Sequence, residues 1–233
     1  MTDRHVLFLF GGDQSWKSSA WTASDDRVRG GRSQSYLRCQ NVGPAEFHGH
    51  LDITALGGAG FASQRTVGSL DLDLTCYEGL SISISHSDGK KYTLTLKDEI
   101  LPRRPDGREQ STVSWEFDFV HPDSGELFIK WADFKPTYRG KPKPDTAPLD
   151  LAHVQRISFM MRSFFGEQQG DFELAINHVA AFNTRSSSGS LSLSSSTASV
   201  EVPDLDKVQD KGKHTQDGHR EASWKKWLCG WAR

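Results

Sequence analysis

The sequence predicts an all-β domain built as a sandwich or jelly roll of short antiparallel strands. Apolar and polar residues alternate with a period of two in most segments between residues 5 and 183, which is typical of strands with one buried and one solvated face. Turn-forming residues separate these segments, and no segment carries the apolar period of a long helix. Many short, two-faced strands favour two sheets packed against each other.

Five segments show the clearest alternation, and each is expected to form a half-buried strand. In one of them Leu80, Ile82 and Ile84 alternate with serines, so one face is apolar and the other polar. Weaker alternation predicts five further strands, for a total of about ten. The clear strands are residues 70–76, 80–85, 92–97, 115–119 and 172–176, and the weaker ones are 5–10, 34–39, 46–54, 59–66 and 154–161.

Glycine, proline and aspartate mark the connections between these strands. Ser87-Asp88-Gly89-Lys90 stands between two alternating segments and predicts a hairpin. Residues 98–112 form a polar, basic loop that contains Pro102-Arg103-Arg104-Pro105. Residues 135–150 carry four prolines, and proline lacks the N–H that a central strand donates. We therefore expect this last stretch to cross an edge or an end of the sandwich.

Composition restricts the classes of partner and the compartment. The chain has 233 residues and a net charge of −2, so its overall charge does not favour nucleic acid as a partner. No apolar run approaches the roughly 20 residues that a membrane-spanning helix needs. The first residues run directly into a strand-like segment, and we see no mitochondrial presequence. A cytoplasmic location is therefore one of the two locations that we carry forward.

The composition changes after Asn183. Residues 1–183 are expected to form the β domain, and residues 184–222, rich in serine and then in mixed charge, a disordered linker. The last segment, residues 223–233, is rich in tryptophan, and its apolar side chains share one face of a helix because of their spacing. Such a face would contact a membrane surface or a partner groove; the alternatives are contact with the chain's own sandwich or no defined structure. The residues concerned are Trp224, Trp227, Leu228 and Trp231.

The sequence marks no catalytic or metal-binding constellation. The close pair His48 and His50 has no cysteine or carboxylate spacing that would complete a zinc site, and an exposed strand pair is the preferred interpretation. No nucleophile elbow or nucleotide-binding loop is present. Paired carboxylates for glycoside hydrolysis remain open, but no particular pair stands out. We assign no catalytic residue, cofactor or metal.

A set of charged and aromatic residues is the best candidate for a binding surface. Residues 25–33 combine two carboxylates, three arginines and a glycine pair, and we expect a shaped, charged loop that either forms ion pairs or contacts a partner. Residues 131–140 place aromatics beside a proline- and glycine-containing loop, which suits either packing at a sandwich end or recognition. The expected surface residues are Asp25, Asp26, Arg29, Arg65, Trp131, Phe134, Tyr138 and Arg139.

Several ordered motifs between about residue 5 and residue 183 resemble those of the complex I intermediate-associated protein 30 family. The resemblance implies a galactose-binding-like jelly roll and, in mitochondrial members, assembly of NADH:ubiquinone oxidoreductase by holding membrane-arm intermediates. It brings no catalytic residues. The matching pieces are Phe10 with Trp21, residues 24–33, 47–51, 57–65, 77–80, 88–92, 131–136, 139–140 and 170–174.

Three functions are therefore carried forward. The first is a non-enzymatic assembly or chaperone-like protein that binds protein partners, by resemblance complex I assembly intermediates in mitochondria. The second is a carbohydrate-binding jelly-roll module, which fold analogy alone supports. The third is a hydrolase. Exposed coplanar aromatics on a sheet would favour the second function, and a buried Trp131 with a polar sheet would favour the first.

Overall fold

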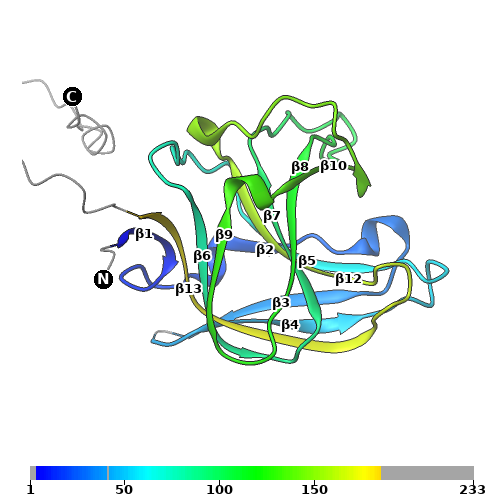
Figure 1. The fold of residues 1–233 in the computed structure, drawn as a ribbon. Coiled ribbons are helices and arrows are strands. Elements are labelled where there is room, and N and C mark those ends of the chain that lie inside the picture. The colour runs from blue at the N-terminus through cyan, green and yellow to red at the C-terminus, as the bar shows by residue number, and fades with distance from the viewer. Residues whose placement is uncertain (1–3, 41, 185–233) are drawn as a thin grey trace, which may run out of the picture. The chain divides into compact units, whose positions relative to one another are not determined.

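The computed structural model describes residues 4–40 and 42–184, and these residues form a jelly-roll sandwich of two antiparallel sheets (Figure 1). The six-stranded sheet has the order β3-β4-β13-β6-β9, with β1 also paired to β13, and the seven-stranded sheet has the order β11-β10-β8-β7-β12-β5-β2. The strands of the first sheet are β1 (Arg4–Gly11), β3 (Gln34–Cys39), β4 (Ala45–Leu51), β6 (Gly79–Ser87), β9 (Gly125–Lys130) and β13 (Gly170–Thr184). Those of the second are β2 (Trp21–Ala23), β5 (Phe61–Thr66), β7 (Lys91–Lys97), β8 (Ser114–Val120), β10 (Lys135–Tyr138), β11 (Lys141–Pro142) and β12 (Arg156–Arg162).

The core lies between the two sheets and is filled by the apolar positions of the alternating strands. Phe47 of β4 packs edge-on against Tyr92 of β7, and both side chains are fully buried. The Tyr92 hydroxyl donates a hydrogen bond to Asp88 Oδ1 at 2.8 Å; burial, followed by the Asp88 charge, raises the pKa of this phenol. A polar group inside the sandwich is thus satisfied at the end of the core.

Nine of the ten expected strands are present, but the segment 70–76 is not a regular strand. Leu72 forms one isolated bridge with Val154, and the Leu74 N–H donates to Leu151 O, so the segment runs beside residues 151–154 without a continuous ladder. The Asp73 carboxylate accepts hydrogen bonds from the N–H and hydroxyl of Thr75. This local turn competes with the ladder and ends the pairing, although the alternating pattern persists.

The expected hairpin at Ser87–Lys90 is wrong. The turn is present, with Gly89 at φ +76°, but it carries the chain from β6 in one sheet to β7 in the other. β6 pairs with β13 and β9 instead. The turn residues therefore specify the reversal of the chain but not the partner of either strand.

The two irregular loops lie where the sequence placed them. Residues 135–142 form the short strands β10 and β11, which end the seven-stranded sheet, so the proline-rich stretch occupies an edge. Helical structure in the described ranges is confined to four short 3-10 turns, and no helix there is long and apolar enough to cross a membrane. They are η1 (Ser18–Ala20), η2 (Asp26–Arg29), η3 (Trp131–Asp133) and η4 (Leu151–His153).

Candidate functional site

Asp26, expected on a charged surface loop, is fully buried at the start of η2. Its carboxylate accepts hydrogen bonds from the Ser33 N–H at 3.1 Å, the Ser33 hydroxyl at 2.7 Å and the Phe61 N–H at 3.1 Å. Gly31 makes room for this carboxylate, because a Cβ at that position would lie 2.2 Å from Asp26 Cγ. The glycine pair is thus explained by close packing as well as by the left-handed φ of +84° at Gly30.

Asp25 makes a parallel set of bonds and joins the two sheets. Its carboxylate accepts from the Ser35 hydroxyl at 2.6 Å and the Ser35 N–H at 3.1 Å on β3, and from the Ser63 N–H at 2.9 Å on β5. Burial raises the pKa of Asp25, the hydrogen bonds from Ser35 and Ser63 oppose this, and the charge of Asp26 adds to the rise. β3 and β5 belong to different sheets, so the carboxylate connects them.

For Asp25 and Asp26 these contacts differ from both expected alternatives, an ion pair or a contact with a partner. Among the described residues neither Asp25 nor Asp26 pairs with an arginine or lysine, and their exposed fractions are 9% and 0%. Backbone N–H groups and serine hydroxyls satisfy both carboxylates. Both residues hold the sandwich together. Arg29, by contrast, is exposed, and its guanidinium lies 5.5 Å above the Phe61 ring.

The aromatic residues of the segment 131–140 divide into a packed pair and an exposed pair. The Trp131 indole N–H donates to Tyr77 O at 2.6 Å, and Phe134 is only 3% exposed and lies against Trp131 and Phe117. Of the two alternatives for this segment, packing at the sandwich end therefore describes Phe134, and Trp131 is half-buried. The rings of Trp131 and Phe134 thus pack against other residues of the sandwich.

Tyr138 and Arg139 follow on the outside of the same segment. Tyr138 is 38% exposed, and the Arg139 guanidinium lies 5.4 Å from its ring centre. Arg139 Nε donates to Ser111 Oγ at 3.2 Å. Arg139 is thereby connected to the loop 98–112, which is also the loop that Arg65 reaches.

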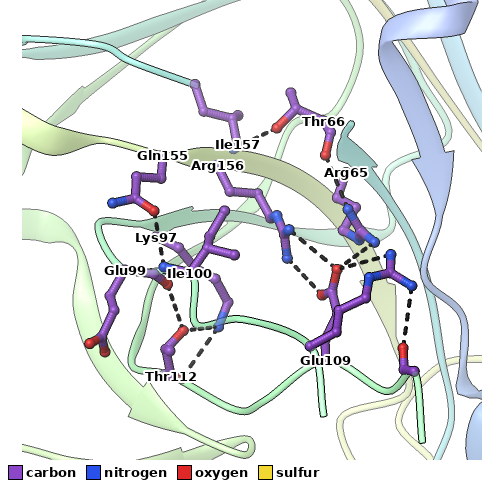
Figure 2. A network of polar contacts seen from close by, with 12 residues as sticks. Arg65, Thr66, Lys97, Glu99, Ile100, Glu109, Thr112, Gln155, Arg156 and Ile157 are labelled. Carbon is purple, nitrogen blue, oxygen red and sulfur yellow. Dashed lines mark hydrogen bonds and ion pairs between the residues drawn. The ribbon is translucent and has the colours of Figure 1, made fainter. Parts of the chain in front are cut away.

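Arg65 and Arg156 enclose the Glu109 carboxylate on the outer face of the seven-stranded sheet (Figure 2). Arg65 Nη2 donates to Glu109 Oε1 and Arg156 Nη1 to Glu109 Oε2, each at 2.8 Å. Arg103 Nη2 lies 3.8 Å from Glu109 Oε1. Burial favours a raised pKa for Glu109, but the hydrogen bond from Arg156 and the three guanidinium charges outweigh it and lower the pKa.

A second charged cluster lies on the same face. Arg162 Nη1 donates to Glu116 Oε2 at 2.8 Å, and Arg162 Nη2 donates to both Asp118 oxygens, at 2.5 and 2.7 Å. A hollow of about 410 Å³ is bordered by all three side chains and by Lys135 of β10. The outer face of this sheet is thus built from paired charges.

Register explains why these groups lie together. Thr95 of β7 pairs with Glu116 on one side and with Ser158 on the other, and Ser158 pairs with Arg65. Side chains directly opposite each other on one face lie within contact distance. Among the described residues, the buried hydroxyl of Thr95 has no hydrogen-bond partner, and neither do the Nε atoms of Arg65, Arg156 and Arg162.

Sequence reasoning found Arg65 and Arg139 but missed most of this face. Glu116 alternates with apolar residues, and Arg156 lies at the start of an expected strand, so each is recognisable as an outward position. Their proximity depends on strand order across the sheet, which the sequence pattern does not reveal. The predicted docking residues Trp224, Trp227, Leu228 and Trp231, and the predicted linker 184–222 apart from Thr184, lie outside the described residues.

The fold and this face define a jelly-roll domain with a polar, ion-paired outer sheet. Among solved structures, the chain is similar to the family 11 carbohydrate-binding module of the cellulosomal cellulase Lic26A-Cel5E of Clostridium thermocellum, with a TM-score of 0.50, 17% identity, and coverage of 80% of this chain and 99% of that one. A solution structure of CtCBM11 gives a TM-score of 0.51 at 14% identity, covering 78% and 96% of the two chains. Identities this low establish the fold alone.

The family follows from sequence. Complex I intermediate-associated protein 30 (CIA30) matches residues 8–176. An uncharacterized protein of Schizosaccharomyces pombe is 39% identical over 184 residues, which cover 76% of this chain and 84% of the relative. This chain therefore belongs to the CIA30 family, as the ordered motifs indicated.

Proposed function

We propose that this chain is a non-enzymatic, chaperone-like assembly factor that binds protein intermediates of respiratory complex I. The observation that carries the proposal is the CIA30 match across residues 8–176. The family's name associates it with complex I intermediates, and this match spans nearly the whole sandwich. By the same association the proposed location is the mitochondrion, with the cytoplasm as the alternative.

The described surface supports binding rather than chemistry as its use. The outer face of the seven-stranded sheet carries fixed charges, notably Arg65, Arg156 and Arg162, and such charges give orientation and partner selection in protein contacts. Of the expected surface set, Arg29, Tyr138 and Arg139 are exposed and remain proposed partner-contact residues. Trp224, Trp227, Leu228 and Trp231 remain a proposed docking segment for a membrane surface or a partner.

Affinity purification from cells tests this function. The full chain and a version lacking residues 184–233 would be expressed in place of the endogenous protein, and co-purifying proteins identified by mass spectrometry. We expect respiratory-chain subunits with the full chain, and reduced complex I activity when the protein is absent. Recovery of other partners only, with normal complex I in cells that lack the protein, would contradict the proposal.

Carbohydrate binding is a second candidate, and one observation favours it besides the fold. Tyr36 is 53% exposed and stacks on His48 with ring centres 5.5 Å apart, beside a hollow of about 660 Å³ that both residues border. A tyrosine ring offers an apolar face, on which the C–H face of a sugar can stack, and a hydroxyl that can hydrogen-bond. If this function holds, Tyr36→Ala abolishes binding on a glycan array, while Tyr138→Ala, also at an exposed tyrosine, does not. No glycan binding by the unaltered chain would remove the candidate.

A further inference from the structure

Residues 101–110, here called the latch, make polar contacts with the rest of the described domain through a single side chain. Hydrogen bonds and ion pairs within the latch include Arg104 N–H to Arg108 O at 2.9 Å and Gln110 Nε2 to Pro102 O at 2.9 Å. Among the polar contacts of the described residues, only the Glu109 carboxylate leaves the latch, to Arg65 and Arg156. The latch is therefore a small preformed loop with one polar attachment.

Hydrogen bonds hold the chain on both sides of the latch. The Ile100 N–H donates to Gln155 Oε1 at 3.0 Å, and on the other side the Thr112 hydroxyl accepts from Lys97 Nζ at 2.8 Å. Figure 2 shows both contacts beside the Glu109 attachment. Because its ends are held, displacement of the latch would not require the strands to move, and its internal hydrogen bonds would be kept.

Arg65 and Arg156, which lie beneath the latch, present two guanidinium groups to one carboxylate. With Glu109 in place the Arg156 and Arg65 side chains are 7% and 14% exposed, and the Arg156 guanidinium donates to Glu109 from both Nη1 and Nη2. Arg65 Nη1 is fixed further by a 3.2 Å bond to Thr66 O. Each also has a buried Nε that has no hydrogen-bond partner within residues 4–40 and 42–184. Rigid, planar forks of this kind suit carboxylate oxygens.

Charge at this site is unbalanced. Three guanidinium groups, of Arg65, Arg103 and Arg156, face the one carboxylate of Glu109. Burial lowers the pKa of Arg65, the neighbouring Arg156 charge lowers it further, and Glu109 opposes both. The Lys97 ammonium lies on the same face, and burial followed by the charge of Arg156 lowers its pKa as well. The site therefore favours a carboxylate as its occupant.

From these contacts we infer that Arg65 and Arg156 form a binding site for an acidic side chain of a protein partner, and that Glu109 occupies this site until the partner displaces it. The identity of the occupant as a protein rests on the proposed function, while the carboxylate chemistry rests on the arginine pair. Displacement exchanges one carboxylate for another, so the buried arginines keep a counter-ion throughout. Arg103 belongs to the latch and moves with it, and its guanidinium, on a side chain 66% exposed, adds positive charge near the site.

The direct test uses a fluorescein-labelled hexaglutamate peptide and the full-length chain at about 50 mM salt, where surface charges are weakly screened. Glu109→Gln removes the internal carboxylate while keeping the side chain's size. We expect this variant to bind the peptide about tenfold more tightly than the unaltered chain, because the fraction of open sites rises. Arg65→Gln in the Glu109→Gln background should remove the gain.

A matched control separates this effect from net charge. Glu126→Gln removes an equivalent charge on β9 of the other sheet, where Glu126 lies near His178, and it should not increase binding. Equal gains in the two variants, no gain in Glu109→Gln, or equally tight binding of a dodecathymidylate of greater charge would overturn the inference. Thermal unfolding establishes that each variant is folded, and Arg103→Gln, on an exposed side chain, supplies a milder second variant with an expected smaller loss.

Hydrogen exchange supplies an independent readout of latch opening. Glu109→Gln should accelerate exchange of the backbone amides in residues 101–110 and leave those of β5 and β12 unchanged. Unchanged exchange in the latch would contradict its displacement. If affinity purification recovers no complex I subunits, the function proposed above fails while the peptide result stands, so the two failures are distinguishable.

Discussion

Two of the acidic sites of this domain, Asp25 with Asp26 and Glu109, satisfy their carboxylates in opposite ways. Asp25 and Asp26 are buried and accept hydrogen bonds from neutral donors, namely backbone N–H groups and serine hydroxyls. Glu109 is 35% exposed at its side chain and is held by arginines. The first arrangement joins two sheets, and the second attaches one loop to one sheet.

This difference separates a structural role from a binding role. Neutral, fixed donors around Asp26 provide no charge that another molecule could use, and removing the carboxylate leaves donors unpaired inside the protein. The arginines around Glu109 keep their charge when Glu109 leaves, so another carboxylate can replace it. A cluster of acidic and basic residues in sequence can therefore indicate either role.

Asp26→Ala should produce the largest change. It leaves the Ser33 and Phe61 N–H groups without their acceptor, and we expect a loss of about 3 kcal/mol in the free energy of unfolding, measured by urea denaturation. Asp171→Ala, at a side chain 92% exposed, is the control and should change stability by less than about 0.5 kcal/mol. Similar small losses in both variants would show that the bonds from Asp26 to Ser33 and to Phe61 of β5 do not stabilise the fold.

Gly31→Ala tests the same site by filling the space next to Asp26 without removing its carboxylate. The added methyl would lie 2.2 Å from Asp26 Cγ, and relieving this clash should cost about 2 kcal/mol. Gly30→Ala is matched, because its Cβ meets no atom within 4 Å and only the φ of +84° opposes it, with a cost of about 1 kcal/mol. A larger loss at Gly30 than at Gly31 would contradict the close approach of Asp26.

The contributions of Asp25 and Glu109 to folding stability should change with pH in opposite directions. Burial, the largest influence, raises the folded-state pKa of Asp25 above its ordinary 3.8, so its contribution to stability is present below that pH and is lost as pH rises through the folded-state value. Although burial opposes it, the arginines lower the pKa of Glu109 below 4.5, so its contribution is present above that pH and is lost as pH falls.

The measurement is urea unfolding of the unaltered chain, Asp25→Asn and Glu109→Gln between about pH 3 and pH 6. Relative to Asp25→Asn, the unaltered chain should lose stability as pH rises. Relative to Glu109→Gln it should lose stability as pH falls, by a modest amount because solvent screens this partly exposed group. Slopes of the same sign would remove the distinction between the sites.

The sequence predicted the strands well because alternation is a local consequence of burying one face. It could not predict partners that depend on distant segments: Asp88-Gly89 marks a turn, yet the strands on its two sides join different sheets. Likewise Asp25 and Asp26 read as surface charges because their donors, Ser35, Ser63 and Phe61, lie on strands whose positions only the fold defines. The position of Asp25 and Asp26 in a charged loop therefore did not predict that their side chains are buried.

Glu109 is a second case in which the local sequence did not predict the contacts of a carboxylate. It stands in a polar loop among other charged residues, and nothing local distinguishes it from Asp106. Its two arginines come from β5 and β12, which pair with each other with Ser158 opposite Arg65. The pairing register of distant strands therefore brings Glu109 and its two arginines together, and the local sequence supplies only the residue types.

Arg29→Ala should have the smallest effect and tests whether residues 25–33 retain any surface role. The exposed guanidinium lies 5.5 Å from the Phe61 ring centre, a contact worth about 0.5 kcal/mol at an exposed site. Urea denaturation should register this small loss, and Phe61→Leu should make Arg29→Ala neutral because the ring is then absent. If Arg29→Ala lowers recovery of complex I subunits in affinity purification while stability falls only by this amount, Arg29 contacts the partner. Unchanged recovery would confine the loop to the structural role that Asp25 and Asp26 perform.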